Sequence, residues 1–361
     1  MSADDSEIPG RQRAATILDV AEAAGVAVGT VSRYLNGQSV RVTNRNQIED
    51  AIQRLGYRKN ALAAAMKSEF TNTVGFLVPR MTEYHAAVLE HLSDALRRQG
   101  RALLSYCHNE DSTSVVELLD FFAGHRVDCV IMDGRIDEIE RIRDTVRGGT
   151  PMIFYDNDVP GPAVDRVFVE NRTASFRAVS HLLDIGHSRI AVMTGAIKNW
   201  TGGERFEGYR QAMTERGMTI NPDYVLDGHW SEDEAFSGML QLLTLREPPT
   251  ALFCCNYNMT VGALRMIKEQ GLKVPDDMSL VSFDDVPLFR LHEAGITAVA
   301  QPIAKIAETI ASILASRLSE RGAMHAPHTI VLDCDIILRG STRRLEAGTE
   351  AGRSASSQVR T

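Results

Sequence analysis

The sequence predicts two folds on one chain: a small all-α head near the N-terminus, followed by a large two-lobed α/β body with parallel sheets. Two observations carry this prediction. Between residues 17 and 55, apolar side chains recur at helical spacing and are interrupted by glycine. From Thr73 onward, short apolar runs alternate with helical patterns, as in parallel sheets that helices cover on both faces. The 361 residues suffice for two or three domains with full-sized cores.

The head opens with a predicted helix whose apolar face consists of Ile17, Val20, Ala21 and Ala24. Gly25 follows where the chain must turn with positive φ, and a second helix is expected over residues 28–35. A third helix is expected from about Thr43 and stops at Gly56. Its apolar face consists of Ile48, Ala51, Ile52 and Leu55. Three short helices in this order, the first two joined through a glycine turn, predict helix-turn-helix geometry.

The second predicted helix exposes side chains that suit nucleic acid. Its outward positions are Gly29, Thr30, Ser32 and Arg33, that is, short hydroxyl donors and one long forked cation. Such groups near a helix start match phosphate oxygens and the edge of guanine. Residues 11–68 carry nine Lys or Arg against four Asp or Glu, although the whole chain has a net charge of −8. This asymmetry favours contact between the head and phosphates; the alternative is a small helical adaptor with a solvated basic face.

The body contains two successive series of predicted strands. The first series reads TVGFLV, ALLSYC, CVIM and PMIFYD, with helices around residues 87–99 and 115–123. The same alternation of strands and helices restarts at RVFVEN and continues through RIAVMTG, TALFCC and SLVSFDD. A second lobe of similar size is therefore expected. Ligands of parallel sheets bind beyond the carboxyl ends of the strands. The residues at those ends are Arg80, Asp156, Asn256 and Asp284.

Composition and motifs argue against several other classes of protein. The five cysteines show no C-x-x-C spacing, which favours buried reduced thiols and a reducing compartment. The acidic start MSADDSEIPG is not typical of a secretory signal, and no run of about 18 apolar residues predicts a membrane span. We therefore expect a cytoplasmic protein. No H-E-x-x-H or G-x-S-x-G motif occurs, and TGGERFEG lacks the ending of a phosphate loop, so neither an enzyme nor a cofactor or metal site is expected.

Two stretches, TILDVAEAAGVAVGTVSRYLNG and RLGYRKNALAAAMKS, resemble the DNA-binding head and hinge of the LacI family of bacterial transcriptional regulators. The resemblance implies a set of DNA contacts: Val28, Gly29 and Arg33 at base-reading positions, Thr30 and Ser32 on phosphates, and also Asn36, Met66 and Lys67. Residues 60–68 resemble the family's hinge helix, which packs against its twin in a dimer. Met66 takes the place of the leucine that family members insert into the minor groove. The alternative for this segment is an ordinary linker.

The body is similar to the effector domain of the same family, itself similar to periplasmic sugar-binding proteins. The most specific stretches are HLLDIGHSRIAVMTG, ERFEGYRQAM, PPTALFCCN and VPDDMSLVSFDD. The resemblance makes Arg205 the cleft arginine and Trp230 an aromatic platform, with Asn256 as a polar clamp. It makes Asp284 the carboxylate that anchors a hydroxyl, and this combination suits a small polyhydroxylated effector. The full set of expected effector contacts is Arg80, Tyr84, His85, Asp156, Arg205, Trp230, Asn256 and Asp284.

The sequence departs from the family pattern at several positions. Ala27 replaces a common serine, which removes a helix cap, and Gly29 offers no side chain for base recognition. In the hinge, Ala64 replaces an arginine, and in the body Tyr257 replaces an aspartate. Arg80 stands where an acid is common. Together with the cleft arginine, it biases the expected pocket towards an anionic compound such as a sugar acid or a sugar phosphate.

These observations predict five segments: a disordered tail over residues 1–13, a helix-turn-helix domain over 14–58, a hinge helix and linker over 59–70, an effector-binding and dimerisation domain over 71–340, and a disordered tail over 341–361. We expect a homodimeric repressor that binds a pseudo-palindromic operator and responds to a sugar-like effector, with no cofactor and no membrane. The alternatives are an activator, or a corepressor-dependent regulator that responds to a non-sugar metabolite. A free solute-binding protein fits the body alone, but the attached head argues against it.

Overall fold

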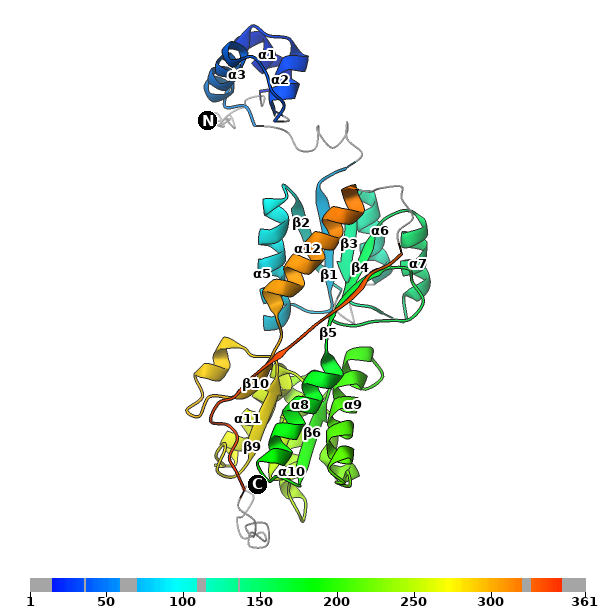
Figure 1. The fold of residues 1–361 in the computed structure, drawn as a ribbon, viewed down its shortest axis with the longest axis vertical. Coiled ribbons are helices and arrows are strands. Elements are labelled where there is room, and N and C mark those ends of the chain that lie inside the picture. Colours follow the sequence, from blue (N-terminus) through cyan, green and yellow to red (C-terminus); the bar gives the residue numbers. More distant parts are fainter. Residues whose placement is uncertain are drawn as a thin grey trace, which may run out of the picture. The chain divides into compact units, whose positions relative to one another are not determined.

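The computed structural model describes residues 15–35, 37–58, 70–108, 115–135, 137–319 and 326–345. The chain divides into two units, Met1–Thr71 and Asn72–Thr361 (Figure 1). Residues 59–69, which include almost all of the predicted hinge helix and linker, lie outside the described residues. The same is true of Ala64 and of three expected DNA contacts, Asn36, Met66 and Lys67.

The N-terminal unit contains the three helices that the sequence predicts: α1 (Ile17–Ala24), α2 (Val28–Leu35) and α3 (Val42–Leu55). A capping box fixes the start of α1, because the side chains of Thr16 and Asp19 each accept a hydrogen bond from the other residue's backbone N–H. Gly25 ends α1 in the left-handed conformation, with a φ of 63°. Side chains from all three helices form one core, made of Val20, Ala21, Ala24, Val31, Ile48 and Ala51.

The expected core position of Leu55 is wrong. Leu55 is the last residue of α3 and is 36% exposed. The chain turns at Gly56, with a φ of 58°, and the side chain of Tyr57 packs against the core of the unit instead. Because the left-handed turn redirects the chain, helical spacing no longer decides which side chain is buried at this end.

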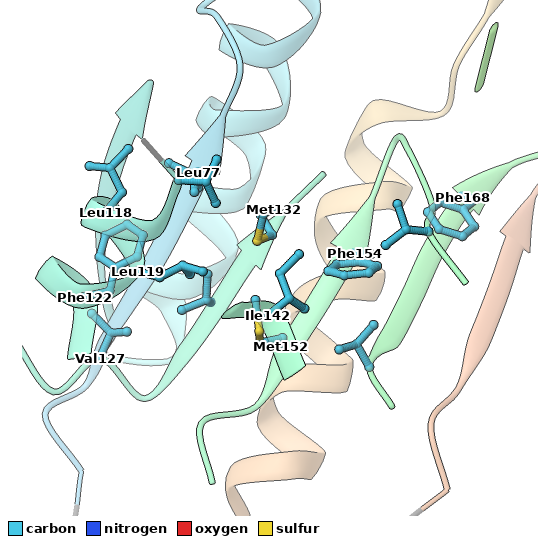
Figure 2. Packing of buried hydrophobic residues seen from close by; sticks show 14 residues of the cluster. Leu77, Leu118, Leu119, Phe122, Val127, Met132, Ile142, Met152, Phe154 and Phe168 are labelled. Carbon is cyan, nitrogen blue, oxygen red and sulfur yellow. The ribbon is translucent and has the colours of Figure 1, made fainter. Parts of the chain in front are cut away.

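The second unit contains two lobes, each built on a sheet. The first sheet has the strand order β11-β5-β4-β3-β1-β2, and all its neighbouring strands are parallel. Its strands are β1 (Thr73–Val78), β2 (Ala102–Cys107), β3 (Cys129–Met132), β4 (Met152–Tyr155), β5 (Asp165–Val169) and β11 (Thr329–Leu332). The helices of this lobe are α5 (Glu83–Arg98), α6 (Val115–Gly124), α7 (Ile139–Arg147) and α12 (Ile303–Ser319). A core of buried apolar side chains, including Phe122, Met132 and Phe154, lies between the sheet and α6 and α7 (Figure 2).

The second sheet has the strand order β12-β10-β9-β8-β6-β7. Its strands are β6 (Ile190–Thr194), β7 (Val225–Asp227), β8 (Ala251–Cys254), β9 (Ser279–Phe283), β10 (Thr297–Ala300) and β12 (Asp335–Ile337). All neighbours are parallel except β12, which is antiparallel to β10. The helices of this lobe are α8 (Asn171–Asp184), α9 (Trp200–Glu215), α10 (Glu232–Thr244) and α11 (Tyr257–Glu269), together with the 3₁₀ turns η1 (Pro222–Tyr224) and η2 (Pro287–Arg290). The expectation of two α/β lobes with parallel sheets is confirmed.

The expected boundary between the lobes is wrong in one respect. The stretch RVFVEN, which the strand rhythm places at the start of the second lobe, forms β5 and pairs with β4 in the first sheet. The chain passes into the second lobe only after Val169, returns at α12, and crosses again between β11 and β12. Figure 1 shows α12 beside α5 in the first lobe. Periodicity identifies a strand but does not say which sheet it joins. The three connections between the lobes therefore cannot be predicted from the order of the strands along the chain.

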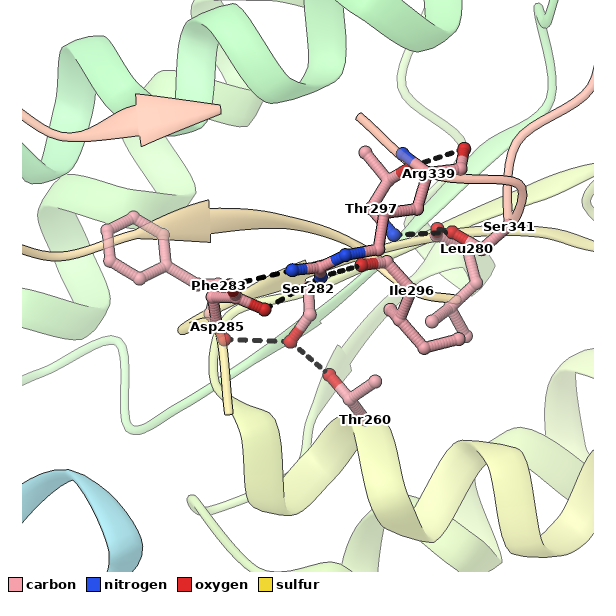
Figure 3. Close-up of polar contacts among 9 residues, drawn as sticks. All are labelled: Thr260, Leu280, Ser282, Phe283, Asp285, Ile296, Thr297, Arg339 and Ser341. Atoms are coloured by element: carbon pink, nitrogen blue, oxygen red, sulfur yellow. Dashed lines mark hydrogen bonds and ion pairs between the residues drawn. The ribbon is translucent and has the colours of Figure 1, made fainter. Parts of the chain in front are cut away.

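The ordered body extends beyond the expected limit at residue 340. Ser341 is fully buried, and its Oγ donates to the carbonyl of Leu280 at 2.6 Å and accepts from the N–H of Thr297 at 2.7 Å (Figure 3). Farther on, the N–H of Leu345 donates to the carbonyl of Ile185 at 2.9 Å. The predicted tail therefore does not begin at residue 341, because residues 341–345 pack on the second lobe.

Candidate functional site

In the N-terminal unit, α2 carries five of the expected DNA contacts: Val28, Gly29, Thr30, Ser32 and Arg33. The first two and the last are exposed, and the two hydroxyl-bearing residues are half-buried. Val31, on the opposite side of the helix, is fully buried in the core. The outward side of α2 thus presents a guanidinium and two hydroxyl groups next to a residue without a side chain.

The guanidinium of Arg33 differs from those of Arg45 and Arg54 in the same unit. Arg45 lies 3.3 Å from a carboxylate oxygen of Glu49, and Arg54 donates to the carbonyl of Ala23 at 3.2 Å. The guanidinium of Arg33 has no ion-pair or hydrogen-bond partner among the residues that the structure describes. Its guanidinium is therefore available to a ligand outside the unit, whereas the other two already have partners within it.

The second unit holds a cavity of about 1400 Å³ at the carboxyl ends of both sheets. All eight residues that the sequence assigns to an effector line this cavity: Arg80, Tyr84, His85, Asp156, Arg205, Trp230, Asn256 and Asp284. The first four come from the first lobe and the last four from the second. The fold therefore brings together side chains that are widely separated in the sequence.

Arg205, in α9, is the most firmly held cation of the cavity and is only 3% exposed. Its Nε donates to Oδ1 of Asn171 at 2.8 Å, and its Nη1 donates to the carbonyl of Cys255 at 2.6 Å. The guanidinium lies over the ring of Phe283, with Cζ 3.6 Å from the ring centroid. These contacts fix its orientation, and Nη2 donates to none of the described residues, so that it remains available to a ligand.

Trp230 forms an aromatic wall of the cavity, and its position depends on a glycine. The indole lies so close to Gly195 that a Cβ added to this glycine would collide with the ring. The guanidinium of Arg205 lies 5.7 Å from the centroid of the same ring. An aromatic face beside a fixed donor suits a ligand that has both CH groups and hydroxyl groups.

Asn256 and Asp284 follow neighbouring strands of the second sheet, β8 and β9. Asp284 is 8% exposed and accepts a hydrogen bond from Nε2 of Gln301 at 2.7 Å. Asn256 caps α11, because its Oδ1 accepts from the N–H of Met259 at 2.9 Å. The cap occupies the amide oxygen and leaves the amide NH₂ of Asn256 as a donor for a ligand.

A polar network braces the end of β9 on both sides of Asp284 (Figure 3). Before it in the chain, the hydroxyl of Ser282 donates to the carbonyl of Phe283 at 2.8 Å and lies 2.7 Å from Oγ1 of Thr260. After it, Asp285 accepts two hydrogen bonds from Arg339, at 2.7 and 2.8 Å. This bracing holds the carboxylate of Asp284 at one position on the cavity wall.

The titratable groups of the cavity lie close enough to influence one another. Burial is the main cause that raises the pKa of Asp156 to about 6. The guanidinium of Arg205 lowers this pKa, whereas the charges of Asp133 and Asp284 raise it. The pKa of Tyr84 lies well above its usual range, first because of burial and then because of the charges of Asp156 and Asp284. The hydroxyl of Tyr84 therefore stays protonated at neutral pH.

The charge inside the cavity does not support the expected bias towards an anionic ligand. Arg80 is exposed, so that its charge is solvated. Of the buried and half-buried charged groups that line the cavity and have no charged partner in a salt bridge, three are the carboxylates of Asp133, Asp156 and Asp284, and two are the guanidiniums of Arg135 and Arg205. A bound anion would meet this excess of negative charge, whereas an uncharged group with hydroxyls would not.

Hydrogen bonds join the two lobes on opposite walls of the cavity. On one wall, the N–H of Glu83 donates to the hydroxyl of Tyr257 at 2.8 Å. On the other, Thr201 donates from its N–H to Oδ1 of Asn157 at 3.2 Å and from its hydroxyl to the carbonyl of Asp156 at 2.5 Å. The lobes are therefore joined beside the cavity, and Tyr257, a departure from the family pattern, contributes one of these contacts.

Sequence reasoning missed several residues of the cavity. Asp133 directly follows β3, so the rule that finds Asp156 after β4 could have found it. Gln301 and Thr201 gave no signal, because each acts through a partner in another element. Two other kinds of site have no candidate in the part of the chain that the structure describes. No group of three or more His, Cys, Asp or Glu could hold a metal ion, and no helix is long and apolar enough to span a bilayer.

Comparisons with known proteins agree with this division of the chain. Residues 16–60 match the model of bacterial regulatory proteins of the lacI family, and residues 179–342 match a periplasmic binding protein-like domain. The transcriptional repressor PurR of Haemophilus influenzae is 30% identical over 337 residues, which cover 92% of this chain and 99% of PurR. The chain belongs to the LacI family. Its head is the DNA-binding helix-turn-helix domain of a transcriptional regulator.

Solved structures of LacI-family proteins have the same architecture. The complex of the transcriptional regulator CelR with cellobiose is 28% identical, with a TM-score of 0.69, and the match covers 91% of this chain and 99% of CelR. The lac repressor dimer bound to operator and the anti-inducer ONPF has a TM-score of 0.79 at 24% identity, and the match covers 92% of this chain and all of the lac repressor chain. The expected fold of the LacI family, with a periplasmic binding protein-like body, is confirmed.

Proposed function

We propose that the protein is a homodimeric repressor that binds a pseudo-palindromic operator in the bacterial cytoplasm and is controlled by a small sugar-like effector. The observation that carries this proposal is the convergence of eight expected effector contacts on one cavity, in a chain with a DNA-binding head. Repression, rather than activation, is supported by the relative PurR, which is a transcriptional repressor.

For the operator, we assign base contacts to the exposed side of α2 and phosphate contacts to its hydroxyl groups. Arg33 is exposed, and its guanidinium has no partner among the described residues, as expected of a residue that reads a guanine edge. Thr30 and Ser32 lie at the edge of the same surface, where phosphate oxygens run along the groove. The remaining assigned contacts are Val28, Gly29, Asn36, Met66 and Lys67.

For the effector, we propose an uncharged compound with several hydroxyl groups. Trp230 offers a face to CH groups, while Asp284 accepts and Arg205 donates hydrogen bonds to hydroxyls. The excess of carboxylates argues against the sugar acid or phosphate that Arg80 suggested. The CelR structure contains cellobiose, a neutral sugar, which is consistent with this choice.

We propose that a second copy of the chain covers an apolar groove on the second lobe. The groove has a volume of about 690 Å³ and is lined by residues of α11 and of the segment around η2. Two leucines beside it are unusually exposed, Leu288 at 52% and Leu291 at 81%. The solved lac repressor that shares this fold is a dimer. A homodimer would present two heads to two operator half-sites.

The coupling between effector and DNA follows from closure of the two lobes. A ligand that binds both walls of the cavity favours the closed form, and Gln301 links Asp284 to one of the connections between the lobes. Movement of the first lobe would then reach the segment that leads to the head. Coupling free energies of this kind are about 1–3 kcal/mol, or about 5- to 150-fold in operator affinity.

The proposal is tested by DNA footprinting across the native genome with the full chain. We expect a protected palindrome, and we expect Arg33→Ala to weaken binding to it about 10- to 100-fold, since a guanine contact contributes about 1–3 kcal/mol. Arg216→Ala is the matched control, because it removes the same charge from an exposed site in the body that pairs with Asp184.

Two results would contradict the proposal. One is the absence of any protected palindrome, with or without neutral sugars. The other is equal binding by the Arg33→Ala and Arg216→Ala variants, which would mean that α2 does not read the groove. An effect of neutral sugars on footprint affinity in either direction supports control by effector, and its sign distinguishes an inducer from a corepressor.

A further inference from the structure

Four buried polar side chains lie together at the carboxyl ends of the strands of the first sheet, and only His85 among them was expected to contact an effector. We call His85, His108, Asp133 and Tyr155 the inner polar cluster. His85 lies in the first turn of α5, while the other three stand at or directly after the carboxyl ends of β2, β3 and β4. The sheet order β4-β3-β1-β2 brings these ends together, and His85 and Asp133 line the cavity.

Each member of the inner polar cluster is more than nine-tenths buried. The exposed fractions are 7% for His85, 1% for His108, 6% for Asp133 and 0% for Tyr155. Each also has a buried polar atom without a hydrogen-bond partner among the described residues: Nε2 of both histidines, Oδ1 of Asp133 and the hydroxyl of Tyr155. Leaving a buried polar atom unpaired destabilises the folded protein, so four such atoms in one place require an explanation.

Contacts on several sides hold the imidazole of His85 in place. Nδ1 of His85 lies 2.7 Å from Oγ1 of Thr82, which holds the imidazole ring. The rings of Tyr84 and Tyr155 meet the same imidazole edge-on, with centroids 5.3 and 6.3 Å away. Nε2 of His108 lies 3.5 Å from Oδ1 of Asp133, within range of an ion pair but without the geometry of a hydrogen bond. His85 is thus fixed, and the members of the cluster do not satisfy one another's polar atoms.

The charge of the inner polar cluster limits what it can bind. Asp133 contributes a hydrogen-bond acceptor and repels anions. Burial lowers the pKa of His85 to about 4, an effect that the charge of Asp133 opposes and His108 adds to, so this imidazole is neutral at neutral pH. An apolar group would leave every unpaired atom as it is. A hydroxyl group can donate to the carboxylate and also pair with the imidazole and the phenol.

We propose that the inner polar cluster is a subsite that receives a hydroxyl group of the effector and selects uncharged, hydroxylated compounds over their acids. This inference rests on the proposed function, since it takes the cavity as the effector site. The same hydrogen bonds could be made by a bound water, which would give the cluster a structural role. The two occupants are distinguished by experiment.

The first experiment measures thermal unfolding of the full chain without any ligand. A subsite keeps polar atoms unpaired for its ligand, so we expect Asp133→Asn and Tyr155→Phe to unfold at the same temperature as the wild type or above it. The matched control is Asp165→Asn in the same lobe. Asp165 is also buried, at 5% exposed, but it accepts hydrogen bonds from Arg317 at 2.6 and 2.8 Å. Its variant should unfold about 2 °C lower or more.

A fall in unfolding temperature for Asp133→Asn as large as that for Asp165→Asn would overturn the proposal, because the carboxylate would then be held by structural partners. This measurement requires no knowledge of the effector.

The second experiment measures binding of D-glucose, D-ribose, cellobiose and D-gluconate to the full chain by calorimetry. We expect a neutral sugar to bind the wild type and to bind Asp133→Asn about tenfold more weakly, with Asp165→Asn unchanged. Equal binding of that sugar to wild type and Asp133→Asn would assign the cluster to a bound water and overturn the proposal, as would tighter binding of D-gluconate than of D-glucose. If none of the four compounds binds, the sugar effector of the proposed function fails, while the unfolding experiment still decides whether the cluster is a subsite.

Discussion

Four residues of the cavity have a backbone conformation that their side chains disfavour. The φ angles are 63° for Asp156, 47° for His229, 59° for Trp230 and 75° for Asp284, all in the left-handed region. Such a conformation costs about 1–2 kcal/mol for a residue other than glycine, and it persists where the surrounding structure enforces it. The polar brace around β9 does so for Asp284. Strain gathered at one cavity supports a binding role for these side chains.

The titration of Asp156 predicts how the stability of the protein depends on pH. Its pKa is about 6 in the folded protein and 3.8 in a model peptide, so folding favours the protonated form. The contribution of this carboxyl to stability is therefore present below about pH 4 and is lost as the pH rises through about 6. Asp156→Asn does not titrate and tolerates a positive φ well.

We expect the unfolding temperature of Asp156→Asn, relative to the wild type, to be higher at about pH 7.5 than at about pH 5. Calorimetric scans of both proteins at the two pH values measure this difference. If the difference in unfolding temperature between variant and wild type is the same at both pH values, the carboxyl of Asp156 has an ordinary pKa.

At the scale of elements, helices and strands were predictable where local spacing decides them. Glycines at positions 25 and 56 delimit α1 and α3 as expected, because each ends its helix in the left-handed conformation. The carboxyl ends of strands correctly led to Asp156 and Asp284 as cavity residues. Spacing could not show the conformation of these two residues, and it could not assign β5 to a sheet, because both depend on contacts between distant segments.

The start of α2 offers a prediction about a single helix. Ala27 precedes the helix and has no side-chain oxygen, while the N–H of Thr30 donates to the carbonyl of Ala27 at 2.8 Å. A serine at position 27 could accept from the free N–H groups of the first turn, and such caps contribute about 1 kcal/mol. We therefore expect Ala27→Ser to slow hydrogen exchange of the α2 amides about fivefold.

Hydrogen exchange of the full chain, followed by mass spectrometry, measures the protection of α2. Ala27→Val is the control, since it adds a side chain of comparable size without an oxygen. Equal protection in the two variants would mean that the helix start is already satisfied in the wild type.

At the scale of the whole effector unit, closure of the lobes depends on contacts that no local pattern reveals. Glu83 and Tyr257, which form the hydrogen bond across one wall, are 174 positions apart in the sequence. The sequence comparison marked Tyr257 only as a departure from the family, without indicating its partner. Arg205 and Trp230 were predicted only through resemblance to that family, because the presence of an arginine or a tryptophan in a sequence does not by itself indicate a cavity.

The hydrogen bond between Glu83 and Tyr257 gives a prediction about closure. Tyr257→Phe keeps the ring and removes the acceptor, so the closed form should lose about 1 kcal/mol, or about fivefold in its ratio to the open form. We expect faster hydrogen exchange at the amide of Glu83 and a larger radius of gyration in solution scattering.

Tyr224→Phe is the matched control, because its hydroxyl donates at 2.6 Å to the carbonyl of Glu247 within the second lobe. If the two variants leave the amide of Glu83 equally protected, the bond across the wall does not hold the lobes together.

Because the chain returns to its first lobe late in the sequence, this lobe cannot be completed until most of the protein has been synthesised. β5 ends at Val169, but its outer neighbour β11 and the covering helix α12 are encoded more than a hundred residues later. At ribosomal speeds this interval lasts roughly ten seconds, during which a nascent lobe carries an open sheet edge and bare apolar surface. Nascent chains on neighbouring ribosomes could pair through that exposed edge. We therefore expect the chain to need chaperones most at this stage of synthesis, before it binds DNA or an effector.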